Sequence, residues 1–224
     1  LVGFSKAITW KELESQYRVV ILADAGAGKT FEMLTQARKM SAQELPAFFI
    51  RIEEIDSDFV QSFDVGTEEQ FERWLTSSAS AWFFLDSVDE ALLNDPKSFE
   101  KAIKCFSRRI KNGAHRAHIY ISSRPYAWRF SADRALIESM LPFSVAKNFE
   151  NGDTDGELKM EVVDEEKVEA LKVYALKPLD ISDIREFASF RSAPKIELLI
   201  AEIERKNLMA MASRPFDLDV MLAK

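Results

Sequence analysis

Residues 18–30 read RVVILADAGAGKT, and this stretch decides the fold. Val19–Leu22 is a short, uninterrupted apolar run, which is typical of a parallel strand that is buried on both faces. A loop of small residues follows, and residues 29–40 are rich in good helix formers. The sequence therefore predicts a strand, a glycine-containing loop and a helix, the first unit of an α/β fold.

The loop has the composition of a phosphate-binding loop, or P-loop, whose pattern is G-x-x-x-x-G-K-[ST]. Gly26 and Gly28 lack a Cβ, so the backbone can approach a phosphate closely and its N–H groups can converge on the anion. Lys29 would supply a positive charge to the β- and γ-phosphates, and the Thr30 hydroxyl would hold Mg²⁺. The nucleotide contacts that we predict here are Ala25, Gly26, Ala27, Gly28, Lys29, Thr30 and Phe31.

The first position of the pattern is Ala23 instead of glycine. Alanine fits there if the turn keeps a negative φ, and the two glycines next to the phosphates are retained. The alternative is a glycine-containing turn at the end of a strand, with an incidental Lys-Thr pair. The flanking strand and helix favour the phosphate-binding interpretation.

The composition is that of a globular protein with one sizeable core, or one core and a small appendage. Apolar residues make up 47% of the 224 residues, and seven glycines and seven prolines argue against a disordered or fibrous chain. The formal net charge of -7 disfavours nucleic-acid binding through the whole surface, but it allows a local basic patch. No apolar run is long enough to span a membrane. With one cysteine no intrachain disulfide can form, so we expect a cytoplasmic protein.

The segment Ala81–Asp86, AWFFLD, is a run of large apolar residues that ends in a carboxylate. A Walker B strand has this form, because it is buried and delivers a carboxylate to Mg²⁺ at its C-terminal end. Asp89 and Glu90 follow, and we predict that one of them orients or deprotonates the attacking water. The alternative is an ordinary strand that is followed by an acidic helix start.

The strand that we predict at His118–Ser123 ends in Arg124 and Pro125. Ligands of open α/β sheets lie at the carboxyl ends of the strands, so an arginine there can bind a γ-phosphate through two hydrogen bonds. We therefore predict Arg124 as a third catalytic residue. The alternative is a surface arginine before a turn-forming proline.

The rest of the pattern alternates strands and helices, as in a mostly parallel sheet flanked by helices. The other predicted strands are Ala47–Ile52 and Ala170–Leu176, and the other predicted helices are Trp10–Ser15, one that opens at Thr67 and one from Asp95 to about Lys111. For residues 143–167 we predict an exposed loop or β-hairpin. From Asp180 the apolar spacing becomes helical, so we divide the chain into an α/β domain, residues 1–178, and the start of a helical domain, residues 179–224.

A few isolated side chains have simple interpretations. Cys105 lies in a helical pattern, which favours a buried apolar thiol over a nucleophile. His115 and His118 lack the further ligands of a metal site, so we predict solvated loop histidines. Trp10 precedes the first strand, and we predict core packing for it, although a segment in this position can also border the base of a nucleotide.

The motifs and their order resemble the NACHT branch of the STAND P-loop NTPases. The resemblance rests on Ala23–Thr30, Phe83–Glu90 and Ile121–Pro125. It extends to Leu176–Asp180 and to Leu208–Leu218, where a proline stands as it does near the base in the helical domain of that family. The resemblance implies that the strand before Arg124 lies between the P-loop strand and the Asp86 strand.

The resemblance also implies a function. It implies ATP or ADP and Mg²⁺ as cofactors, Thr30 and Asp86 as metal ligands, and Pro215 as a contact of the nucleotide. It implies a slow ATPase that acts as a signalling switch, closed with ADP and self-assembling through the NTPase domain with ATP, in bacteria often for antiviral defence. Because the chain starts at Leu1 and ends in a helical pattern, we expect a fragment whose effector and sensor domains lie elsewhere. A non-catalytic nucleotide-binding scaffold and a housekeeping P-loop ATPase or kinase are the alternatives.

The helical segment after Asp180 is too short for a large core of its own. We expect it to bury its apolar face on the carboxyl edge of the sheet, as a lid over the nucleotide with Pro215 against the base. Proline suits this position because it presents a rigid apolar face and has no N–H group to satisfy. The alternative is a packing subdomain that never contacts a ligand.

Overall fold

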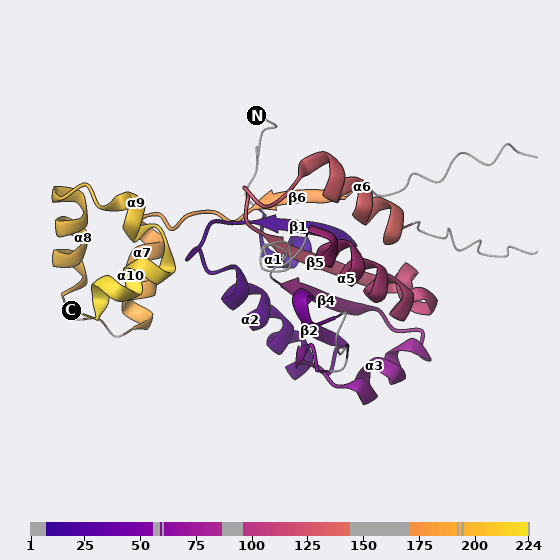
Figure 1. Ribbon diagram of the computed structural model, residues 1–224. Helices are drawn as coiled ribbons and strands as arrows, with labels where there is room; N and C mark the ends of the chain where they lie inside the picture. Colours follow the sequence, from indigo (N-terminus) through magenta and orange to yellow (C-terminus); the bar gives the residue numbers. More distant parts are fainter. Residues whose placement is uncertain are drawn as a thin grey trace, which may run out of the picture.

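The computed structural model describes residues 8–55, 59, 61–86, 96–143, 171–191, 193 and 195–223. These residues form an α/β structure in which a mostly parallel six-stranded sheet is flanked by helices and followed by a group of short helices (Figure 1). The α/β class that the sequence predicts is therefore confirmed. Within the described part, no helix is both long enough and apolar enough to cross a lipid bilayer.

The sheet has its strands in the order β3-β2-β4-β5-β1-β6. The strands are β1 (Arg18–Leu22), β2 (Ala47–Arg51), β3 (Phe63–Val65), β4 (Ala81–Asp86), β5 (Ala117–Ser123) and β6 (Lys172–Ala175). All neighbouring pairs are parallel except β2 and β3. Since β5 lies between β1 and β4, the order that the family resemblance implied for these three strands is confirmed.

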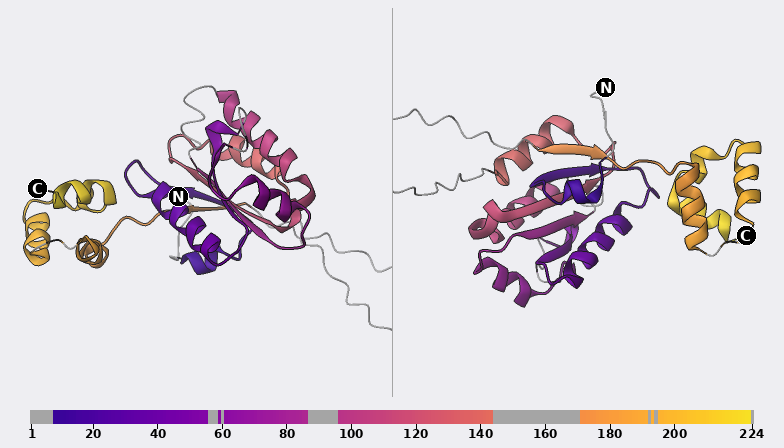
Figure 2. Two further views of the ribbon diagram at one scale, coloured as in Figure 1. Left: turned by 90° about the horizontal axis from the view of Figure 1, so that it is seen from below. Right: turned by 180° about the vertical axis from the view of Figure 1, so that it is seen from behind.

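Helices cover both faces of the sheet (Figures 1 and 2). On one face lie α1 (Trp10–Leu13) and α2 (Lys29–Ala42), and on the other lie α3 (Glu68–Leu75), α5 (Pro96–Arg109) and α6 (Phe130–Met140). Short 3₁₀ segments, η1 (Ile52–Glu54) and η2 (Lys111–Arg116), follow β2 and α5.

The alternation of side chains along the strands decides which groups face α2. On β4, Phe84 belongs to the core cluster of α2, whereas Phe83 and Leu85 belong to the cluster of α5. Two residues beyond Phe84, the same alternation turns Asp86 toward the α2 face. On β5 it turns Ser122, two residues beyond the buried Tyr120, to the same side.

The C-terminal helices, residues 181–222, pack against each other and are called the helical group below. They are α7 (Ile181–Phe190), α8 (Ile196–Arg205), α9 (Met209–Ala212) and α10 (Pro215–Leu222). Their common core consists of Ile184, Ile200, Ile203, Ala212 and Leu218. The expectation that this segment buries its apolar face on the sheet is thus wrong in part, because four short helices bury those side chains among themselves. The group begins next to the predicted boundary at residue 178, and an extended stretch joins it to β6 (Figure 1).

Several local predictions need correction. The strand β3 was not predicted, because three residues are too few to show alternation and its register with β2 is irregular. The helix α5 ends at Arg109, and the chain continues as a 3₁₀ turn through Gly113. Cys105 is half-buried rather than buried. The predicted loop or hairpin at residues 143–167 lies almost wholly outside the described residues.

The prediction that both histidines are solvated is wrong for His118. This residue lies in β5 with 5% of its surface exposed. Its ring is stacked between Tyr17 and Trp82, with centroid distances of 4.1 and 5.0 Å, and its Nδ1 lies 3.0 Å from the carbonyl oxygen of Gln16. These partners come from before β1 and from β4, so no local pattern could reveal them. His115 is exposed, as predicted.

Candidate functional site

The loop between β1 and α2, residues 23–28, is called the glycine loop below. It contains two glycines with left-handed backbone, Gly26 at φ 77° and Gly28 at φ 88°. Gly28 is also the N-cap of α2, so the free N–H groups of the first helical turn begin directly after it. Positive φ in this loop is confined to the glycines, and the N–H of Ala23 donates to the Ser123 carbonyl at 3.1 Å. The condition under which alanine fits the first position of the motif is therefore met.

The carboxylate of Asp86 lies between two hydroxyl groups. Thr30 Oγ1, in the first turn of α2, donates to Asp86 Oδ2 at 2.7 Å. Ser122 Oγ, near the end of β5, donates to Asp86 Oδ1. Asp86 is 3% exposed, and Ser122 is fully buried. Three elements thus bring one carboxylate and two hydroxyls together at the carboxyl edge of the sheet, beside the glycine loop.

This pair of oxygens fits a magnesium ion. Adjacent ligands of an octahedral Mg²⁺, with bonds of about 2.1 Å, lie about 3.0 Å apart. Thr30 Oγ1 and Asp86 Oδ2 are already 2.7 Å apart, so a cation could take the place of the bridging proton with little movement. No group of three or more His, Cys, Asp or Glu that could hold a metal occurs in the described parts of the chain. Nucleotide-bound Mg²⁺ does not need such a group, because phosphate and water oxygens supply its other ligands.

The predicted catalytic residues are described only in part. Arg124 directly follows β5, and its Nη1 donates to the hydroxyl of Tyr126 at 2.9 Å, with the guanidinium 5.9 Å from the centre of that ring. Tyr126 is itself 71% exposed, so this contact lies at the surface. Asp89 and Glu90 lie outside the described residues.

The helical group touches the glycine loop through the start of α10. The N–H of Phe216 donates to the carbonyl oxygen of Gly26 at 3.2 Å. A Cβ added at Gly26 would lie 3.2 Å from the Cβ of Phe216, and one added at Gly28 would lie 3.6 Å from the Cγ of Pro215. The sequence predicts Pro215 against the base of a nucleotide, and in the structure Pro215 lies beside the glycine loop. The contact of Phe216 with this loop had no sequence signal. The predicted contact residue Phe31 is 68% exposed.

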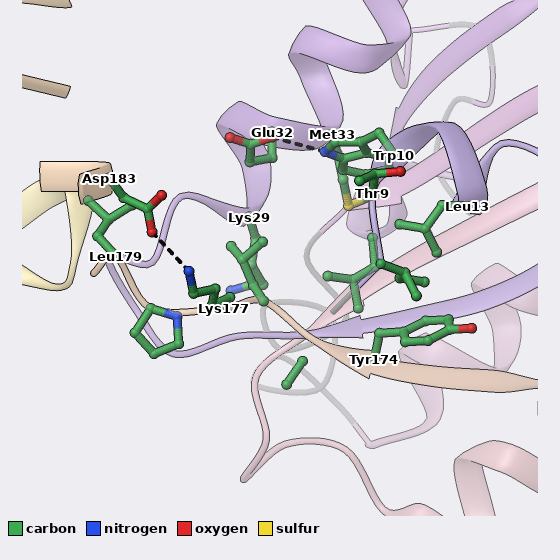
Figure 3. Close-up of a pocket in the computed structure, with 15 residues that line it drawn as sticks. Thr9, Trp10, Leu13, Lys29, Glu32, Met33, Tyr174, Lys177, Leu179 and Asp183 are labelled. Carbon is green, nitrogen blue, oxygen red and sulfur yellow. Dashed lines mark hydrogen bonds and ion pairs between the residues drawn. The ribbon is translucent and has the colours of Figure 1, made fainter. Parts of the chain in front are cut away.

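A cavity of about 670 Å³ opens beside the glycine loop (Figure 3). It lies between the segment around α1, the first turns of α2 and the stretch that follows β6. Its lining residues are Ile8, Thr9, Trp10, Leu13, Ile21, Lys29, Glu32, Met33, Tyr174, Ala175, Leu176, Lys177, Pro178, Leu179 and Asp183. The walls are mainly apolar, with a few polar groups, which is the usual composition of a small-molecule site.

The polar groups of this cavity are held by defined partners (Figure 3). Trp10 Nε1 donates to Glu32 Oε2 at 3.0 Å, and the Trp10 ring lies 6.3 Å from the ring of Tyr120. Trp10 is partly buried and packs against the core, in agreement with the predicted packing role, and it also lines the cavity. At the opposite wall, Lys177 Nζ donates to Asp180 at 2.7 Å and to Asp183 at 3.3 Å. The hydrogen bond from Lys177 lowers the pKa of Asp180 to about 2, so this ion pair persists at neutral pH.

The residues that sequence reasoning missed belong mostly to this cavity and to the surroundings of Asp86. Ser122 could have been found from its position two residues after an inward-facing Tyr120. Glu32 and Lys177 lie in ordinary helical and linker patterns, which contain no such signal.

The chain matches no protein-family model, and no curated protein is significantly similar to it.

Proposed function

We propose that this chain is a Mg·ATP-binding switch module of the NACHT/STAND type that hydrolyses ATP slowly. The observation that carries the proposal is the hydrogen bond between Thr30 and Asp86. Thr30 directly follows Lys29 after the glycine loop, in which Gly26 and Gly28 have left-handed backbone, and Asp86 ends β4. A hydroxyl at a helix start next to a buried carboxylate at a strand end suits a Mg²⁺ that is bridged to phosphate.

In this proposal the phosphates bind at the start of α2. The first N–H groups of the helix and the charge of Lys29 attract them. When bound, Mg²⁺ would be held by Thr30 and Asp86 and would offset the charge of the β- and γ-phosphates. Ser122 would keep the carboxylate in position, and Arg124 would leave Tyr126 to bind the γ-phosphate. Asp89 or Glu90 would orient the attacking water.

The cavity beside Lys29 is the proposed location of the base and ribose. Its apolar walls favour a flat ring, and the Glu32 carboxylate and backbone groups of the lining segments offer hydrogen-bond partners. Its walls come from the segment around α1, which precedes β1, and from residues 174–179, which form the end of β6 and the stretch after it. A nucleotide there would contact the linker to the helical group.

The switch itself rests on the contact between α10 and the glycine loop. Phosphates that bind at Gly26 would meet Phe216 and Pro215, so occupancy of the loop and the position of the helical group are coupled. A ligand shifts a conformational equilibrium only by interacting differently with two states, and this contact supplies such a difference. The family resemblance further supports self-assembly with ATP, a cytoplasmic location and a part in bacterial antiviral defence.

Calorimetry with Lys29→Ala tests the binding site. The variant should lose measurable ATP binding because the phosphates lose their countercharge in a partly desolvated site. If Lys29→Ala binds ATP as tightly as the wild type, the proposed site is wrong.

Phosphate release distinguishes the possible activities. Slow release that does not depend on an added hydroxyl acceptor supports the switch, whereas acceptor-dependent transfer would indicate a kinase. Binding without any release would indicate a scaffold. The combined variant Asp89→Asn/Glu90→Gln should bind ATP normally and release phosphate at least about tenfold more slowly. Unchanged release would remove the catalytic assignment of both carboxylates.

A further inference from the structure

Helix α5 carries a concentration of positive charge in a chain that is acidic as a whole. Residues 97–111 contain six Lys or Arg and one Glu, a net charge of +5, whereas the net charge of the chain is -7. The charge is therefore unevenly distributed. A surface of this kind can attract a polyanion even though the protein as a whole repels it.

The apolar and the charged side chains of α5 lie on opposite sides of the helix. Phe99, Ile103 and Phe106 point into the core and are fully buried. Lys101, Lys104, Arg108 and Arg109 are exposed and, with the half-buried Cys105, line a shallow pocket of about 310 Å³. These four cations are called the α5 basic face below. Within the described ranges, none of the four forms an ion pair, and the guanidinium of Arg109 lies 5.2 Å from the centre of the Phe59 ring.

The spacing of these cations suits a row of phosphates. Lys101, Lys104 and Arg108 occupy positions i, i+3 and i+7, so they follow one side of the helix. With a rise of 1.5 Å per residue, the row extends about 10 Å along the helix axis. This length corresponds to about three phosphate spacings, or four phosphates, of one strand of a duplex, since the phosphates are about 3.4 Å apart along its axis.

The face lacks the features of a protein-binding surface. No large apolar side chain of α5 is among the exposed ones, and Lys is depleted from the centres of protein interfaces, where aromatic and apolar anchors dominate. Among the described residues of α5, no exposed aromatic ring is available for a base to stack on. We propose that the α5 basic face binds the phosphate backbone of nucleic acid without sequence preference.

This surface is separate from the proposed nucleotide site. The helix α5 packs on the opposite face of the sheet from α2, so the two anion-binding regions do not share residues. The proposal therefore does not depend on the proposed function. A local basic helix also reconciles nucleic-acid binding with the acidic composition that argues against it for the whole surface.

Fluorescence anisotropy with a labelled duplex of arbitrary sequence tests the proposal, using the whole chain at 50 mM salt with saturating Mg·ATP. We expect micromolar affinity that falls with salt at a log–log slope of about -3.6, for four neutralised phosphates. The variant Lys101→Glu/Lys104→Glu should bind at least tenfold more weakly, with about half that slope. The matched control Arg38→Glu/Lys39→Glu makes the same charge change on exposed positions of α2 and should stay within about twofold of the wild type.

Several outcomes would overturn the proposal. One is the absence of binding by the wild type at 50 mM salt, and another is an equal loss of affinity in both double variants, which would indicate a global charge effect. Duplex binding that occurs only when Mg·ATP is left out, together with loss of that binding in Lys29→Ala, would assign the phosphates to the glycine loop instead. Polyglutamate that binds as tightly as the duplex would identify a surface for acidic proteins. Thermal unfolding of both variants checks that they fold like the wild type.

Discussion

Replacing Ser122 with alanine should lower the free energy of unfolding by about 2 kcal/mol. The hydroxyl of Ser122 donates to the carboxylate of Asp86, and the two residues are 0% and 3% exposed. Water therefore cannot readily replace the missing donor. Hydrogen bonds to charged groups contribute about 1.5–3 kcal/mol, and the loss should fall in this range because Thr30 still donates to the other oxygen.

Ser123→Ala is the matched control for this experiment. Ser123 is the next residue on β5 and is also 0% exposed, but its hydroxyl donates to the neutral carbonyl of Arg124 at 3.3 Å. This weaker bond should contribute about 0.5–1 kcal/mol. In a chain of this size 1 kcal/mol shifts Tm by about 2–4 °C. Calorimetric melting should therefore show a decrease of about 4–8 °C for Ser122→Ala and at most about half of that for Ser123→Ala.

Binding measurements provide a second readout that a purely structural effect would not move. If Ser122 holds Asp86 in position for Mg²⁺, Ser122→Ala should weaken the binding of Mg·ATP and leave the binding of ATP in EDTA unchanged. Equal Tm decreases in the two serine variants would refute the reasoning, because a bond to a buried charge would then contribute no more than a bond to a neutral carbonyl.

Three further outcomes are expected. Arg124→Ala should reduce the ratio of ATP to ADP affinity, because ADP has no γ-phosphate; an unchanged ratio in calorimetry would contradict a γ-phosphate contact. ADP should slow hydrogen exchange at residues 213–218, where α10 meets the glycine loop, and protection of the glycine loop alone would leave the helical group outside the switch. The hydrogen bond from Lys177 lowers the pKa of Asp180 from its ordinary value of 3.8 to about 2. This bond stabilises the start of α7 above pH 4 and should be lost as pH falls from 4 to 2, so the Tm difference between the wild type and Asp180→Asn should shrink over that interval. A constant difference would argue against the ion pair.

Much of the fold was predictable because its signals are local. The run Val19–Leu22 and the segment Ala81–Asp86 are apolar enough to require burial on both faces, and parallel strands need helices between them. The strand bounds differ from the predictions by a few residues, since strand ends depend on pairing partners. The edge strand β3 has neither the length nor the alternation that a local pattern requires.

The sequence by itself determined which residues can carry the proposed chemistry. Gly26 and Gly28 permit a left-handed backbone that other residues resist, and Asp86 ends a strand too apolar to stay outside the core. The tertiary structure alone decided which of these groups meet. The pairing of β4 with β5 brings Ser122 to Asp86, and the return of α10 brings Phe216 to Gly26. These partners lie 36 and 190 positions apart, and their contact depends on strand register and helix packing, which arise from the whole core and not from any local pattern.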